Sequence, residues 1–169
     1  MNSARIHGRR TALLSFILFF FLTAPVARGG DSAPPFDPAV PGINLVKLVS
    51  GTEALQAINK LHGLAIPMKA GFIAHYTGSH GKTTIWVSEA PTVAAGKQQI
   101  DVMIEKMKEN PRSPFRNYDS LAVNDVPIIR FHGMGQVHTV FQLDAWVYWI
   151  SAHGKDMDIL LTHLCQDET

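Results

Sequence analysis

The chain has 169 residues, among them 15 Lys and Arg, 14 Asp and Glu, 8 His and one cysteine. This length fits one domain with short additional segments. A hydrophobic fraction of 46% with a charged fraction of 17% excludes a disordered chain. The lone Cys165 excludes both an intramolecular disulfide framework and a cysteine-based zinc cluster.

Residues 1–29 are typical of a secretory signal peptide. Arg5, Arg9 and Arg10 form a basic start without acids, and an apolar stretch over 12–22 and then small residues follow. These are the three parts of such a signal, and the apolar stretch is shorter than the ~20 residues that a membrane-spanning helix needs. We therefore expect an exported protein, periplasmic or secreted, with no stable membrane span after cleavage near Gly30. An uncleaved N-terminal anchor is the alternative.

Cleavage would also change the charge of the protein. It removes four arginines, which leaves 11 of the 15 basic residues against 14 acidic ones. The mature chain contains no cluster of Lys and Arg that could neutralise phosphates. We therefore expect no nucleic-acid partner.

The mature chain begins with residues 30–42, which are rich in proline and predict a linker or an arm that lies on the domain. The rest, 43–169, is expected to be one domain. Its first helix follows a Ser50-x-x-Glu53 capping box and ends near Gly63.

Hydrophobic periodicity and turn residues predict the later elements. Segment 112–125 is polar and rich in turns, with room for a short strand near 120–123. The expected strands are 70–77, 82–89, 126–132, 137–143 and 146–152, and the expected helices are 92–109 and 155–165. The order α-β-β-α-β-β-β-α predicts an α+β fold: two layers, an antiparallel sheet of about five strands with helices packed on one face.

Strand alternation assigns side chains to the two faces of this sheet. A turn over 78–81 pairs Phe72 with Val87 on the core face and Ile73 with Trp86 on the outer face. A two-residue Asp144-Ala145 turn likewise pairs Phe141 with Tyr148 inside and Val140 with Trp149 outside.

For the hairpin between these pairs, an odd-length loop at Gly133-Met134-Gly135 puts Ile129 and Phe131 on the core face. Arg130 then lies opposite His138 on the outer face. The outer face, expected on the side away from the long helix, thus gathers five candidate ligand-binding residues: Trp86, Arg130, His132, His138 and Trp149.

Two tryptophans make this outer face too apolar to remain in contact with water. The first helix or the proline-rich arm could cover it, a homodimer partner could do so, or it could form a ligand groove. We expect a non-enzymatic binding or accessory domain that holds a protein partner or small ligand, with Arg130 as the anion anchor.

The alternative function is copper or zinc binding by His132, Met134 and His138, with His75 as a further ligand. No cofactor is required by the first interpretation. An enzyme is the third interpretation, because Ser151 opposite His138 is the one nucleophile–base pair that the register predicts, and no acid orients the histidine.

Overall fold

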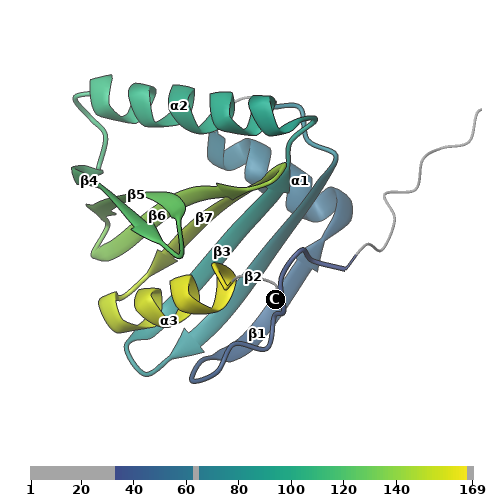
Figure 1. Cartoon of the computed structure of the whole chain (residues 1–169), viewed down its shortest axis with the longest axis vertical. Coiled ribbons are helices and arrows are strands. Elements are labelled where there is room, and N and C mark those ends of the chain that lie inside the picture. The colour runs from purple at the N-terminus through teal and green to yellow at the C-terminus, as the bar shows by residue number, and fades with distance from the viewer. Residues whose placement is uncertain (1–32, 63–64, 167–169) are drawn as a thin grey trace, which may run out of the picture.

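The computed structural model describes residues 33–62 and 65–166. Its seven strands form one antiparallel sheet in the order β1-β2-β3-β7-β6-β5-β4 (Figure 1). The strands are β1 (Asn44–Ser50), β2 (Ala70–Gly78), β3 (Gly81–Glu89), β4 (Arg116–Val123), β5 (Val126–Gly133), β6 (Gln136–Leu143) and β7 (Trp146–Ala152). The helices are α1 (Gly51–His62), α2 (Val93–Glu109) and α3 (Gly154–Leu164). The predicted signal peptide lies outside the described residues.

The predicted α+β class with an antiparallel sheet is confirmed, but the sheet has seven strands instead of about five. The additional strands, β1 and β4, form its two edges. Each contains a register shift, at Leu45/Lys47 and at Arg116/Asp119. A bulge breaks the two-residue alternation on which strand prediction relies, so neither segment has a regular strand pattern.

Helices cover both faces of the sheet, which corrects the expected two-layer arrangement. On one face, α3 buries Leu160 and Leu161 against the strands. The proline-rich arm lies on the same face, where the hydroxyls of Tyr76 and Tyr148 donate hydrogen bonds to the carbonyls of Pro38 and Pro35 at 3.1 and 3.3 Å.

None of the helices in the described part of the chain has the length and apolar character needed to cross a bilayer.

The other face carries the tryptophans and lies under α1 and α2. Trp86 packs on the cluster that includes Ile58 of α1, and Trp149 packs on the cluster that includes Ile100 and Ile104 of α2. The tryptophan face is therefore the one covered by the long helix, so the expectation that it lies away from this helix is wrong. Of the predicted covers, the first helix is confirmed, and it shares the face with α2.

Two of the three predicted registers are confirmed. Phe72 pairs with Val87 and Ile73 with Trp86 across β2 and β3. Phe141 pairs with Tyr148 across β6 and β7. In both hairpins the side-chain alternation and the turn length agree, so only one register satisfies both.

The register predicted between β5 and β6 is wrong by one residue. Phe131 pairs with His138, and Arg130 pairs with Thr139. The loop has two central residues, Met134 and Gly135, with φ of 50° and 76°, as a type I′ turn requires. A shift of one residue reverses every side chain of the strand. Phe131 therefore lies on the tryptophan face, whereas Arg130 and His132 lie on the α3 face.

The predicted capping box at the start of α1 does not form as expected. The Glu53 carboxylate is 3.2 Å from the Lys47 ammonium of β1 and is engaged there instead of at the Ser50 amide. Both side chains are more than half exposed, so this ion pair contributes little to stability.

The β5–β6 turn yields a test of the observed register. Replacing Met134 with asparagine should raise the free energy of unfolding by about 0.5 kcal/mol, because asparagine tolerates a left-handed φ better than methionine does. Met134 is 69% exposed, so little packing is lost. Urea denaturation measures the change, and Met134→Gln, which retains the cost of positive φ, should leave stability unchanged. Equal stability of the two variants would favour the three-residue loop.

Candidate functional site

The five predicted ligand-binding residues do not form one site. Trp86, His138 and Trp149 share the helix-covered face, with the two indoles edge-to-face at 6.5 Å. Arg130 and His132 lie on the opposite face. There the Arg130 guanidinium is 2.5 Å from the Asp119 carboxylate, so the predicted anion anchor is already paired within the chain.

His138 is part of a buried hydrogen-bond network. Its Nε2 donates to the Gly133 carbonyl at 3.0 Å, which leaves Nδ1 as an acceptor. Nδ1 accepts from the Ser151 hydroxyl at 2.7 Å and from the Trp149 indole at 3.2 Å. His138 is 1% exposed, and its ring stacks on Phe131 with centroids 5.4 Å apart. Both ring nitrogens are therefore occupied, and the network holds Trp149 in place.

The predicted metal ligands are separated by the sheet. His132 and His138 lie on opposite faces, Met134 is exposed at the turn, and His75 contacts Thr84 at 3.2 Å. Within the described residues, no group of three or more His, Cys, Asp or Glu side chains is placed to hold a metal ion. His132, Met134 and His138 therefore cannot share one ion in this arrangement.

The predicted nucleophile–base pair is also enclosed. Ser151 and His138 are 5% and 1% exposed, and the second nitrogen of His138 contacts a backbone carbonyl instead of a carboxylate.

Burial raises the pKa of the Cys165 thiol to about 11, so at neutral pH it is not a thiolate.

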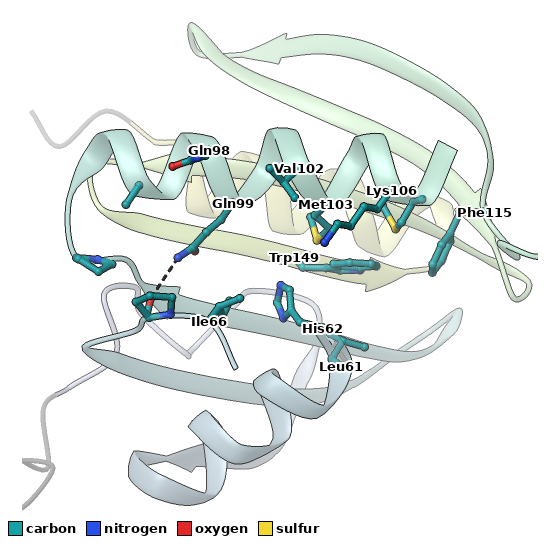
Figure 2. A pocket seen from close by; sticks show the side chains of 14 residues that line it. Leu61, His62, Ile66, Gln98, Gln99, Val102, Met103, Lys106, Phe115 and Trp149 are labelled. Atoms are coloured by element: carbon teal, nitrogen blue, oxygen red, sulfur yellow. Dashed lines mark hydrogen bonds between the residues drawn. The ribbon is translucent and has the colours of Figure 1, made fainter. Parts of the chain in front are cut away.

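The tryptophan face is open between its two helices, where a groove of about 460 Å³ lies over Trp149 (Figure 2). We call it the helix groove. Most of its lining is apolar: Leu61, Ile66, Pro67, Pro91, Ala95, Val102, Met103, Met107, Phe115 and Trp149. Its polar lining residues are His62, Gln98, Gln99 and Lys106.

Local structure explains why the groove remains open. Thr92 caps α2 by accepting from the Ala95 amide at 3.1 Å. Gly96 allows this end of the helix to approach the sheet, because a Cβ there would lie 2.9 Å from the Gln142 amide nitrogen. Both helices contact the sheet more extensively than they contact each other. The Gln99 side chain spans one end of the gap by donating to the Pro67 carbonyl at 3.1 Å (Figure 2).

The remaining polar groups of the groove come from both walls. The His62 Nδ1 donates to the Ile58 carbonyl at 2.9 Å, one turn back in α1, and Figure 2 shows its ring directed towards α2. Lys106 extends back along the α2 wall towards Met103 (Figure 2).

A second cavity, of about 470 Å³, lies on the α3 face. Arg130 and His132 line it together with Asp158 and Thr162. It collects charges of both signs, and Arg130 is paired with Asp119, so this cavity shows no preference for one class of ligand.

Of the five residues expected to bind a ligand, Trp149 lines the helix groove, and the residues of its walls were not predicted. No sequence motif singles out His62, Met103 or Met107. One signal was available in α2: Val102 adds to its apolar stripe and widens it beyond what Ile100 and Ile104 need to reach the sheet. In the structure Val102 is 39% exposed and Leu61 on the facing wall is 46% exposed.

No model of a known protein family and no curated protein matches this chain. Among solved structures, it is similar to a GTP binding regulator from Thermotoga maritima, with 10% sequence identity and a TM-score of 0.45. The similarity covers 73% of this chain and 76% of that one.

The His138 network makes stability depend on pH. Burial lowers the pKa of His138, the hydrogen bond to Gly133 raises it in part, and nearby His132 lowers it further. The unfolded chain takes up this proton near pH 6.5, whereas the folded chain takes it up at a lower pH. The free energy of unfolding should therefore fall as the pH drops below about 6.5, as measured by urea denaturation between pH 7.5 and pH 5.

The variants His138→Gln and His132→Gln separate this effect from other titrations. His138→Gln should show a weaker decline with pH, and His132→Gln, an exposed residue on the other face, should retain most of it. A decline that is unchanged in His138→Gln would contradict the assignment.

Proposed function

We propose that this protein is a small, non-enzymatic binding domain that holds an apolar small molecule in the helix groove. This keeps the binding role predicted from the sequence but moves the site from an open sheet face to the gap between α1 and α2. Trp149 is the one predicted ligand-binding residue that lines it.

The observation that carries the proposal is the size and lining of the groove. A volume of about 460 Å³ lies within the ~300–1,000 Å³ of ligand pockets, which are mostly apolar with a few polar groups. Ten of the fourteen lining residues are apolar. The hydrogen bond to His138 and the edge-to-face contact with Phe131 fix the Trp149 ring in the floor of the groove. Its position is therefore set before a ligand binds.

A neutral fluorescent probe tests this function directly. N-phenyl-1-naphthylamine should bind saturably at one site per chain with increased emission, because the groove removes its apolar surface from water. Ala95→Trp places a large ring in the groove and should weaken binding at least tenfold. The matched variant Ala94→Trp alters an exposed neighbour outside the lining and should bind as the unmodified protein does. Equal affinities for the two variants, or no saturable binding, would contradict the proposal.

We also propose that the domain acts after export, on the basis of the signal peptide pattern in residues 1–29. Production of the full chain in a bacterial host should give a protein that starts near Gly30, as measured by mass spectrometry of the fraction outside the cytoplasm. Recovery of the intact chain in the membrane fraction would instead support the uncleaved anchor.

A further inference from the structure

We infer that the helix groove takes an elongated amphiphile with an anionic head group, such as an alkyl or aryl carboxylate, whose head lies against Lys106. This inference rests on the proposed function and specifies the ligand class of the same site.

The charge of the groove supports an anion. Lys106 is the only lysine or arginine among the lining residues, and none of them is an acid. The acids that α2 does carry, Asp101, Glu105 and Glu109, are exposed outside the lining, and Asp101 is paired with Lys97 at 2.8 Å. The groove therefore has one net positive charge at neutral pH and no carboxylate of its own to balance it.

Lys106 also differs from neighbouring lysines in its contacts. Lys97 pairs with Asp101, Lys69 pairs with Glu89, and Lys108 lies over the Tyr118 ring at 5.1 Å. Lys106 has no ion pair with any residue that the structure describes. Lys106 is exposed to solvent, so its attraction for an anion is strengthened only on the side where its charge borders apolar surface and the local dielectric is lower.

The position of the Lys106 charge sets the direction in which an amphiphile can lie in the groove. The lining follows α2 from Ala95 to Met107, a length of about 18 Å at ~1.5 Å per residue. Figure 2 shows Gln99 towards one end of the groove and Phe115 at the other, with the Lys106 side chain running back along α2 from the Phe115 side towards Met103. A ligand whose acidic group meets the Lys106 ammonium near Met103 therefore extends its apolar body past Val102 towards Ala95.

The sparse polar lining disfavours a peptide as the occupant. An extended peptide presents amide and carbonyl groups that are costly to bury without partners. The Gln99 Nε2 already donates to Pro67 and the His62 Nδ1 to Ile58, so besides Lys106 the main polar groups left for a ligand are the Gln98 side chain and the unpartnered Gln99 Oε1, too few for the backbone of a peptide. An alkyl or aryl acid needs one polar partner, which Lys106 supplies.

The experiment compares decanoate, decanol and protonated decylamine as competitors of N-phenyl-1-naphthylamine, each below its aggregation concentration. These compounds have the same chain and differ in the charge of the head. We expect decanoate to bind about tenfold more tightly than decanol, a ratio typical of one charge-assisted contact, and decylamine to bind most weakly. Added salt should reduce the advantage of decanoate.

Three lysine variants locate the effect. Lys106→Met should reduce decanoate affinity to that of decanol, Lys106→Arg should retain the preference, and Lys97→Met, which removes an exposed lysine outside the lining, should behave as the unmodified protein. Circular dichroism verifies that each variant is folded.

The outcomes distinguish this inference from the proposed function. Equal binding of decanoate and decanol, or an anion preference that persists in Lys106→Met, would overturn the inference and leave an apolar ligand site intact. Failure of the neutral probe itself to bind would overturn the proposed function and this inference together.

Discussion

The whole structure depends on a sheet that is apolar on both faces. Alternate residues of β3 and β7 place Val87 and Tyr148 on one face and Trp86 and Trp149 on the other, and neither set can remain in contact with water. The chain meets this constraint with three helices and an arm: α3 and the proline-rich segment cover one face, and α1 and α2 cover the other (Figure 1). Every other feature of the molecule, including the groove, follows from how completely each face is covered.

The two covers differ in kind: on one face the groove lies between two helices, whereas the cavity on the other face lies between α3 and the strands β4, β5 and β6. The arm accepts hydrogen bonds from two buried tyrosines of the sheet, and α3 packs on the sheet by apolar contact. By contrast, α1 and α2 rest on separate apolar clusters, around Ile58 and around Ile100. Because each helix contacts the sheet more extensively than the other helix, the space between them is left to their side chains. Those side chains are apolar along most of the gap, and one of them, Lys106, carries a positive charge, which is the pattern of an amphiphile site.

The buried His138 network links the sheet to that site. A neutral imidazole that accepts from both Ser151 and Trp149 holds the indole from its nitrogen side, while the rest of the ring lies in the floor of the groove. The histidine that looked like a ligand for metal or substrate thus serves as a support for an aromatic residue that lines the cavity. Its low exposure and its two occupied nitrogens are observations that only the folded chain provides.

The sequence by itself determined the α+β class, the three helices, the five inner strands and two of their registers, because hydrophobic periodicity, the Thr92 cap and the short turns are local signals. It left undetermined the strands at the sheet edges, where bulges interrupt alternation, and the β5–β6 register, where Gly133-Met134-Gly135 is compatible with loops of two or three residues. That one-residue difference moved Arg130 and His132 to the far face. Which helix covers which face, and therefore the existence of a groove between α1 and α2, was decided only by tertiary packing, because local patterns carry no information on which apolar surfaces meet.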